Sequence, residues 1–439
     1  MRVLMFGWEF PPLISGGLGT ACFGLTRELS KRHLDLTFVL PRFDVQQKLN
    51  KVRILGADNL LMDYKLGGGG LSASYRERLA NVTFIQSDAR LQPYARAPFS
   101  ALPQISSAFS PISNEVTSLA PQLRMAGGAS AAGGGQYQAN IYDEIEKLRH
   151  ASHLICATES FDVIHAHDWM TYAAAIEAKN ITGKPLVVHV HSMEFDRSGD
   201  HPNSRIMKEE LRGLRHADRI IAVSDYTKSN LVRRYHIPPE NITTVHNGID
   251  VHESTTFSGV KPLGEVLIMF MGRITFQKGP EYFVEAAKLV YDRCDHVRFV
   301  MAGSGDALEG MIRKVAALKM QDRFHFSGFL GPQEVEKIYG MSDLYVMPSV
   351  SEPFGLTAME ASRFHVPVII SKQSGISEVL DHVLKVDFWD VQKLADCMMA
   401  VVRHPSLRQA LVRHNQLLKH HSWQASAAKV HYIYKELAE

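Results

Sequence analysis

Two carboxylates flank a glycine turn in the segment from Glu352 to Glu360, which reads Glu-Pro-Phe-Gly-Leu-Thr-Ala-Met-Glu. The apolar run at 344–347 predicts a buried strand, the Pro-Phe-Gly turn ends it, and a helical spacing of apolar residues starts at Leu356. The N–H groups at a helix N-terminus attract phosphate. Glu352 and Glu360 can accept hydrogen bonds from hydroxyl groups. The segment therefore predicts a site for a phosphorylated, hydroxyl-rich ligand such as a sugar nucleotide.

A second segment, from Gly272 to Gly279, places Arg273 and Lys278 directly after the apolar run at 266–271. In a doubly wound sheet the ligand crevice lies at the carboxyl ends of the strands. A guanidinium group supplies a directional fork and an ammonium group a point charge, so the pair suits a diphosphate. The alternative is a pair of solvated surface cations.

Near the N-terminus, the turn Ser15-Gly16-Gly17-Leu18-Gly19 follows one apolar run and precedes a helical pattern. Gly16 and Gly17 let backbone amides approach a phosphate or a sugar closely. Glycine-rich turns between strand and helix are common, and this spacing is not that of a dinucleotide fingerprint. The turn supports a ligand site only together with the other motifs.

Histidines gather where two predicted strands end, in His165-Ala166-His167-Asp168-Trp169 and in His189-Val190-His191-Ser192. A neutral imidazole can bind a sugar hydroxyl, although a histidine buried in the core is an alternative. A zinc site is conceivable, but strand alternation sends alternate side chains to opposite faces and no cysteine assists, so we expect no metal. Ser224 follows the run at 220–223 and is either a cleft residue or the cap of a helix that starts at Asp225.

These groups have to be positioned by short apolar strands that alternate with amphipathic helices, a pattern that runs through the chain twice. The predicted strands are Val3–Phe6, Leu36–Leu40, Val163–Ala166, Leu186–Val190, Ile220–Val223, Val266–Met271, Val297–Ala302, Leu344–Met347 and Val366–Ile370. Such alternation predicts an α/β chain with two doubly wound parallel sheets. We expect an N-terminal domain at 1–250, a C-terminal domain at 264–420, and a last helix at 421–439 that packs back across the domains.

Composition fits two cores, because 45% of the 439 residues are hydrophobic. The formal net charge of +2, from 48 basic and 46 acidic residues, gives no reason to expect nucleic acid as a partner. The segment at about 95–140 is rich in Ala, Gly and Ser, which predicts a flexible insertion that is either a loop near an acceptor cleft or a tolerated surface insertion.

The four cysteines are widely scattered, and this predicts a reducing, cytoplasmic setting. The first apolar run lacks the cleavage pattern of a signal peptide, and no run reaches the roughly 18 apolar residues of a membrane span.

Taken together and in order, the motifs at 15–19, 247–250, 272–279 and 352–360 closely resemble the retaining glycosyltransferases of the GT-B fold. The nearest subgroup is glycosyltransferase family 4 with the glycogen and starch synthases. The resemblance implies two Rossmann-like domains facing a central cleft, with the donor held mainly by the C-terminal domain. Those synthases usually carry a lysine where this chain has Ser15.

The resemblance also implies a role for each matching residue. Arg273, Lys278, Glu352 and His191 would be catalytic, with the two cations on the donor diphosphate and Glu352 at the hydroxyls of the transferred sugar. Glu360 would bind the ribose, or, alternatively, only stabilise its helix. The donor site would also include Gly16, Gly17, Gly272, Phe354, Gly355 and Leu356, and the acceptor cleft would include Asp168, Trp169 and Ser224.

The implied reaction is the transfer of glucose from ADP- or UDP-glucose to an α-1,4-glucan, without a cofactor or a metal ion. One alternative is transfer of mannose, galactose or N-acetylglucosamine to a lipid or a small acceptor, and a sugar-nucleotide epimerase is a more distant one. A protein that only binds a nucleotide sugar or a glucan is the non-enzymatic alternative. The sequence does not predict the oligomeric state.

Overall fold

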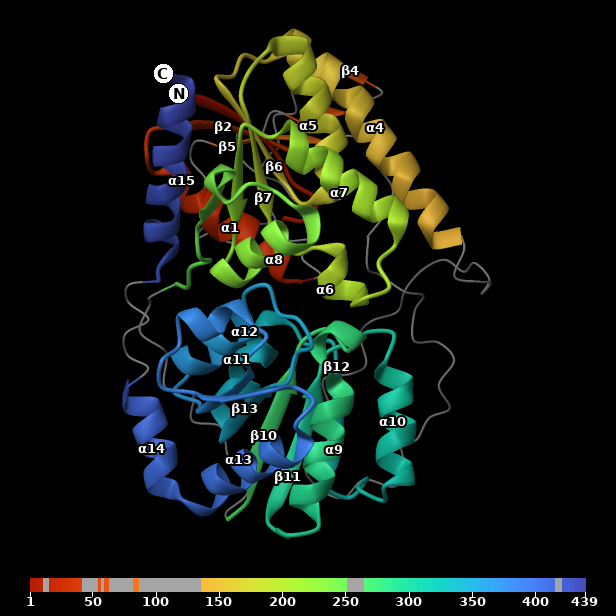
Figure 1. Cartoon of the computed structure of the whole chain (residues 1–439), viewed down its shortest axis with the longest axis vertical. Helices are drawn as coiled ribbons and strands as arrows, with labels where there is room; N and C mark the ends of the chain where they lie inside the picture. Colours follow the sequence, from red (N-terminus) through yellow and green to blue (C-terminus); the bar gives the residue numbers. More distant parts are fainter. Residues whose placement is uncertain are drawn as a thin grey trace.

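The computed structural model describes residues 1–10, 16–41, 54–56, 59–62, 82–86, 136–250, 264–414 and 421–439. Within these ranges the chain forms two parallel sheets, each with helices on both faces, and Figure 1 shows one sheet above the other. The strand orders are β5-β2-β1-β6-β7-β8-β9 and β12-β11-β10-β13-β14-β15. In both sheets the chain starts in the interior and builds outward in two directions, which is the doubly wound arrangement predicted from the sequence.

The first sheet consists of β1 (Arg2–Phe6), β2 (Asp35–Leu40), β5 (Val82–Gln86), β6 (Val163–His167), β7 (Leu186–Val190), β8 (Arg219–Ala222) and β9 (Ile242–Thr244). The second consists of β10 (Val266–Met271), β11 (Val297–Ala302), β12 (Phe324–Gly328), β13 (Leu344–Met347), β14 (Val368–Ser371) and β15 (Leu384–Val386). A separate antiparallel pair is formed by β3 (Ile54–Gly56) and β4 (Asn59–Met62).

Helices of the first half are α1 (Gly17–Ser30), α4 (Gln136–Thr158), α5 (Trp169–Thr182), α6 (Glu194–Ser198), α7 (Ser204–His216) and α8 (Asp225–Tyr235), with the 3-10 turn η1 (Pro239–Asn241). The second half contributes α9 (Pro280–Tyr291), α10 (Leu308–Ala317), α11 (Pro332–Met341), α12 (Leu356–Arg363), α13 (Val391–Arg403) and α14 (Pro405–His414), with the 3-10 turns η2 (Phe276–Lys278) and η3 (Gly375–Glu378). The last helix is α15 (Trp423–Ala438).

Side chains on both faces of each sheet are buried, and this explains why the strands read as continuous apolar runs. In β1, Leu4 and Phe6 belong to one apolar cluster and Val3 and Met5 to the other. All nine predicted strands are present within one or two residues. The prediction missed β12, whose sequence Phe-His-Phe-Ser-Gly is only partly buried, the three-residue strands β3, β9 and β15, and the strands β4 and β5.

The C-terminal helix α15 returns to the first sheet, where it packs on α1, and Figure 1 shows the two helices side by side. The contact is close because Gly24 has no side chain: a Cβ atom there would lie 2.3 Å from the Trp423 ring. Arg27 of α1, itself buried, forms an ion pair with Asp250 at the end of the first half. The chain leaves the first half after Asp250 and returns to it at α15, and these contacts hold both points against α1.

The expected insertion at about 95–140 lies outside the described residues, except for 136–140, which begin α4. Among the described residues, no helix is both long enough and apolar enough to cross a membrane.

Candidate active site

The two predicted cation and carboxylate segments meet at the carboxyl edge of the second sheet. Lys278, at the end of η2, forms an ion pair with Glu352 through Nζ and Oε2. Both side chains are largely shielded, with 19% and 7% of their surface exposed. Ser349 Oγ donates to the same carboxylate oxygen at 3.3 Å, and the backbone N–H of Val350 donates to the Gln277 carbonyl at 2.9 Å. The ammonium group and the carboxylate are therefore held in fixed positions rather than solvated separately.

Helix α12 begins where this carboxylate segment ends, as the sequence predicted. Gly355 precedes the helix with a φ of +115°, a conformation that favours glycine. A Cβ atom on Gly355 would lie 2.9 Å from Ile376 Cγ2. The turn therefore depends on glycine both for backbone conformation and for space, and it leaves the helix N-terminus suited to an anion.

Glu360 lies one turn into α12, and its carboxylate contacts a buried tyrosine. The Tyr339 hydroxyl lies 3.1 Å from Glu360 Oε2 and 3.0 Å from the Thr357 carbonyl oxygen. Burial raises the pKa of Glu360, while the Tyr339 hydrogen bond and the charge of Arg363 act in the opposite direction. Glu360 is therefore not the freely solvated acid that a role limited to the helix dipole would suggest.

The N-terminal glycine turn faces these elements from the other half of the molecule. A Cβ atom on Gly16 would lie 4.0 Å from Arg273 Nε, and one on Gly17 would lie 3.8 Å from Leu356 Cδ1. The structure thus brings together residues separated by more than 250 positions in the sequence. A ligand bound at Arg273 and the start of α12 would therefore also contact the first half of the molecule.

Four histidines at the ends of β6 and β7 form one stacked cluster. The ring centroids of His165 and His167 are 4.4 Å apart, those of His189 and His191 are 4.2 Å apart, and the two pairs lie 5.2 to 5.3 Å from each other. His167 Nδ1 and His191 Nε2 share a hydrogen bond of 2.9 Å. Burial lowers the pKa of His165 and of His191 to about 3, so both imidazoles are neutral at pH 7.

The faces on which these histidines lie differ from those that the argument against a metal assumes. Strand alternation separates adjacent residues, but residues two apart point to the same face, so His165 and His167 share a face, and so do His189 and His191. A cysteine is also present at the cluster. The sulfur of Cys22 in α1 lies within 4.8 Å of a ring nitrogen of His167 and of a ring nitrogen of His191. Both premises of the expectation are therefore wrong.

Asp168, predicted to line the acceptor cleft, holds the residues that follow the neighbouring strand β7. Its Oδ1 accepts hydrogen bonds from the backbone N–H groups of His191, at 2.6 Å, and Ser192, at 3.3 Å. The residue has a φ of +59°, which is unusual outside glycine. Burial raises its pKa to about 7 against the opposing effect of these hydrogen bonds. Asp168 is therefore a positioning residue for the loop that carries His191.

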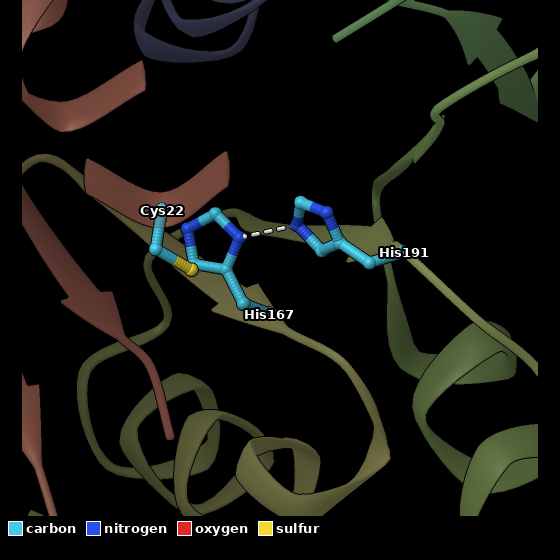
Figure 2. Close-up of side chains that lie close together, drawn as sticks. All are labelled: Cys22, His167 and His191. Carbon is cyan, nitrogen blue, oxygen red and sulfur yellow. Dashed lines mark hydrogen bonds between the residues drawn. The ribbon is translucent and has the colours of Figure 1, made fainter. Parts of the chain in front are cut away.

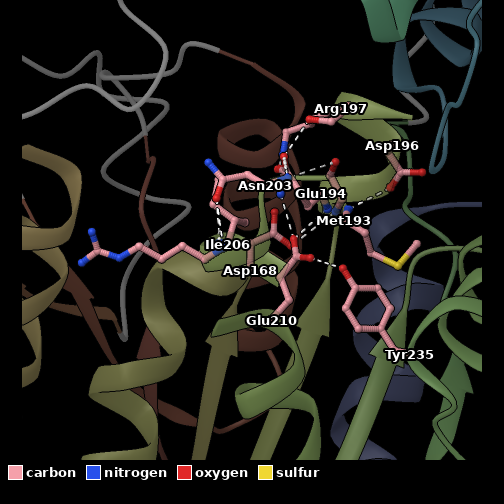
Figure 3. A network of polar contacts seen from close by, with 12 residues as sticks. Asp168, Met193, Glu194, Asp196, Arg197, Asn203, Ile206, Glu210 and Tyr235 are labelled. Carbon is pink, nitrogen blue, oxygen red and sulfur yellow. Dashed lines mark hydrogen bonds and ion pairs between the residues drawn. The ribbon is translucent and has the colours of Figure 1, made fainter. Parts of the chain in front are cut away.

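The loop after β7 is fixed by a buried network of carboxylates, shown in Figure 3. Glu210 of α7 accepts hydrogen bonds from the Glu194 backbone N–H at 2.8 Å, from Arg197 Nη2 at 2.8 Å, and from the Tyr235 hydroxyl. Glu194 in turn accepts from Arg197 Nε at 3.1 Å and from the Asn203 backbone N–H at 3.0 Å. The network immobilises α6, the short helix that meets the second half of the molecule.

We predict that Glu210 makes this network sensitive to pH. Burial raises the pKa of Glu210 to about 7 from its ordinary value of about 4.5. A carboxyl group whose pKa is higher in the folded state stabilises the fold at low pH, and this contribution is lost as pH rises to about 7. Relative to the native chain, Glu210→Gln should therefore gain about 3 kcal/mol of unfolding free energy between pH 4.5 and pH 8.

Urea unfolding of both chains at several pH values measures this difference. Glu209→Gln, one residue away and partly exposed, is the control and should show no comparable change. If the difference in unfolding free energy between Glu210→Gln and the native chain does not change with pH, the prediction is contradicted.

Contacts between the halves involve residues on α6, α8 and η3. Ser351 Oγ donates to Asp196 Oδ1 at 2.5 Å and lies 3.0 Å from the Tyr226 hydroxyl. Glu378 of η3 accepts hydrogen bonds from the first two backbone N–H groups of α8, those of Asp225 at 2.8 Å and Tyr226 at 2.6 Å. A carboxylate of one half thus caps a helix of the other.

We predict that Glu378→Ala shifts the molecule towards an open arrangement of its halves. A carboxylate at a helix N-terminus contributes about 1 to 2 kcal/mol in a partly buried position, so the ratio of closed to open molecules should fall about 5- to 30-fold. Small-angle X-ray scattering should show a larger radius of gyration. Glu334→Ala is the matched control, because Glu334 accepts from the Gly331 N–H within α11 of its own half. Equal scattering of the two variants would contradict the prediction.

Several predicted site residues have structural partners in this arrangement. Ser224 is the cap of α8, the alternative that the sequence left open: its Oγ accepts from the Thr227 N–H at 2.9 Å and donates to the Pro353 carbonyl at 2.6 Å. Trp169 begins α5 and is 5% exposed, and Phe354 is 3% exposed. These three side chains are committed to packing or to hydrogen bonds within the protein.

Sequence reasoning missed Tyr339, Glu210, Ser351 and Glu378. Both Tyr339 and Glu210 lie on amphipathic helices. In the sequence, Tyr339 looks like an ordinary core-facing residue and Glu210 like an ordinary surface residue. Only Glu378 had a signal, because it follows the Ser374-Gly375 turn after a predicted strand. Its partner is the backbone of α8, which no spacing along the chain reveals.

Comparison with known proteins places this geometry in a family. Three family models match successive parts of the chain: a starch synthase catalytic domain at 2–127, glycosyltransferase family 4 at 136–253, and glycosyl transferases group 1 at 252–417. The fold is similar to that of sucrose-phosphate synthase from Thermosynechococcus elongatus, with a TM-score of 0.70 at 16% identity over 100% of this chain and 99% of that one. It is also similar to Anabaena HepE in complex with UDP-glucose, with a TM-score of 0.65 at 14% identity over the whole of both chains.

The chain is therefore a glycosyltransferase of the GT-B fold. More particularly, it belongs to the retaining enzymes of glycosyltransferase family 4 and has an N-terminal region like that of the starch synthases. Among curated relatives, it is 28% identical over 304 residues to D-inositol 3-phosphate glycosyltransferase of Saccharomonospora viridis. That match covers 63% of this chain and 70% of the relative.

Proposed function

We propose that this enzyme transfers glucose from ADP- or UDP-glucose to the non-reducing end of an α-1,4-glucan. The observation that carries the proposal is the fixed pair of Lys278 and Glu352 before α12, in the same half as Arg273, which Gly16 approaches from the other half. Cations and a helix N-terminus suit the diphosphate of a sugar nucleotide, and a buried carboxylate beside them suits the hydroxyls of its sugar.

In this proposal, binding of the donor replaces the contact between Lys278 and Glu352. The ammonium group turns to a diphosphate oxygen, and the released carboxylate accepts a hydrogen bond from the sugar. Arg273 and Lys278 then stabilise the negative charge that builds on the departing diphosphate, without changing protonation state. Because the groups are already oriented, little reorganisation is needed at the moment of reaction.

Retention of configuration requires the acceptor to attack from the face that the diphosphate leaves. We propose that the acceptor hydroxyl enters beside the departing phosphate, and that closure of the two halves excludes water from the donor. The contacts of Glu378 and Ser351 across the halves are the means of closure. His191, held by Asp168, would donate or accept a hydrogen bond at the transferred sugar.

Two observations bear on the acceptor. The match of residues 2–127 to the starch synthase catalytic domain favours a glucan, because acceptors of GT-B enzymes bind mainly to the N-terminal half. The similarity to an inositol-phosphate glycosyltransferase favours a second candidate, a small phosphorylated acceptor. The UDP-glucose bound to HepE is consistent with a uridine donor.

A panel of radiolabelled donors with several acceptors tests the proposal. Label from ADP- or UDP-glucose should enter glycogen or malto-oligosaccharides and should be released by an α-1,4-specific glucosidase. Label found only in an inositol phosphate or in another small acceptor would favour the second candidate. Product in a lipid extract alone, or donor binding without any transfer, would overturn the proposal.

A further inference from the structure

The proposed transfer uses His191 but gives no role to Cys22 or His167, whose ligand atoms lie beside it. One atom from each of the three residues lies within 4.8 Å of the other two. Figure 2 shows the Cys22 thiol of α1 beside the His167 ring, and the hydrogen bond between the rings of His167 and His191. These residues come from three separate elements, so their convergence is a property of the fold rather than of one sequence motif.

Polar atoms in the surrounding cluster lack partners to an unusual extent. Within the described ranges, the buried ring nitrogens without a hydrogen-bond partner include His167 Nε2, His191 Nδ1, both nitrogens of His189, and Nε2 of His165. A buried polar atom left unsatisfied costs about 1 to 3 kcal/mol. These are not the His167 Nδ1 and His191 Nε2 atoms that face each other, so they mark the polar character of this buried region and are not the ligand atoms themselves.

We propose that Cys22, His167 and His191 bind one zinc ion. A tetrahedral ion with bonds of about 2.0 to 2.3 Å needs ligand atoms about 3.3 to 3.6 Å apart. His167 Nδ1 and His191 Nε2 are 2.9 Å apart, and the three-atom set spans at most 4.8 Å, so small side-chain rotations suffice. Zinc prefers thiolate and imidazole ligands, and the set leaves a fourth position for water.

Charge and access support this assignment. Two buried carboxyl groups, those of Asp168 and Glu9, lie near Cys22 and can serve as negative partners of a cation when they are ionised. His191 is only partly buried, so the ion can reach the cluster from that side. Binding converts the thiol to a thiolate and releases its proton to solvent.

Neighbouring groups hold the cluster in place, although within the described ranges they do not reach the second ring nitrogens of His167 and His191. His165 Nδ1 shares a hydrogen bond with the Tyr434 hydroxyl of α15, and this contact fixes the ring that stacks on His167. Asp168 Oδ1 holds the backbone N–H of His191 at 2.6 Å. Partners of this kind orient the ligands of metal sites.

Titration of the full chain with Zn²⁺, after removal of metals with a chelator, tests the assignment by calorimetry and by metal analysis. One ion should bind per chain, with about one proton released. Cys22→Ala and His167→Gln should each weaken binding about 100-fold or more, because even loss of a second-shell partner costs 10- to 100-fold. Cys294→Ala is the matched control, since Cys294 is also buried but belongs to the other half.

Cobalt gives a second measurement that needs no variant. Co²⁺ bound to the native chain should show a charge-transfer band from thiolate sulfur, and added Zn²⁺ should abolish it. A spectrum without that band, or Zn²⁺ affinity that Cys22→Ala leaves unchanged, would overturn the assignment. Both measurements detect binding directly, so their outcome does not depend on which sugar or acceptor the enzyme uses.

Discussion

Lys278→Ala should lower turnover by on the order of 10²-fold, because it removes one oriented charge from the leaving diphosphate. The loss should lie mainly in kcat, since the charge matters most when negative charge has built up in the transition state. The same change leaves Glu352, with 7% of its side chain exposed, without its ion-pair partner. Steady-state kinetics with the donor varied measures the effect.

Two variants separate the role in catalysis from a role in folding. Lys278→Arg retains a cation and should recover part of the rate, although a guanidinium group has a different shape. Lys288→Ala removes a lysine of α9 that pairs with Asp292 on the surface, and its rate should stay near that of the native chain. An unchanged rate in Lys278→Ala would remove Lys278 from the mechanism.

Glu360→Ala should raise the Michaelis constant for the donor about 10- to 150-fold with a smaller effect on kcat. The estimate follows from the loss of a charged hydrogen bond to the ribose, at about 1.5 to 3 kcal/mol. A binding group that acts equally in the ground state and the transition state changes the Michaelis constant rather than the rate.

Tyr339→Phe is the control that the structure supplies. It removes the hydroxyl that lies 3.1 Å from Glu360 Oε2 and leaves the carboxylate in place. If Glu360 binds the ribose, Tyr339→Phe should change the donor constant much less than Glu360→Ala does. If both variants lose only thermal stability and keep a normal donor constant, Glu360 serves the helix and not the nucleotide.

The sequence predicted the fold well because its information is local. Strands such as Val266–Met271 and Leu186–Val190 are apolar on both faces, and their spacing by helices leaves few alternatives to a doubly wound sheet. The position of Gly355 before α12 follows from the same local pattern. Strands of three residues, such as Leu384–Val386, carry too little periodicity to be found.

The candidate site was predicted only in part, because its remaining contacts join distant segments. The pairing of Lys278 with Glu352 follows once the strand order places β10 beside β13. The approach of Gly16 to Arg273 depends on how the two halves meet. The cap formed by Glu378 on α8 depends on how the two halves meet, and no residue pattern encodes that.

The cluster around Cys22 also joins distant segments of the chain. The sequence places the histidines at strand ends, but the cysteine arrives from α1, more than 140 residues earlier. The alternation rule was applied to residues two apart, for which it predicts a shared face. A correct use of the rule would have grouped the four histidines, although not the thiol.

The central claim is that the diphosphate of a sugar nucleotide meets Arg273, Lys278 and the start of α12 between the two halves. A crystal structure of the enzyme soaked with UDP-glucose or ADP-glucose tests it most directly. We predict that the diphosphate oxygens lie within hydrogen-bond distance of both cations and that the ribose contacts Glu360. A nucleotide bound elsewhere, with Lys278 still paired to Glu352, would contradict the claim.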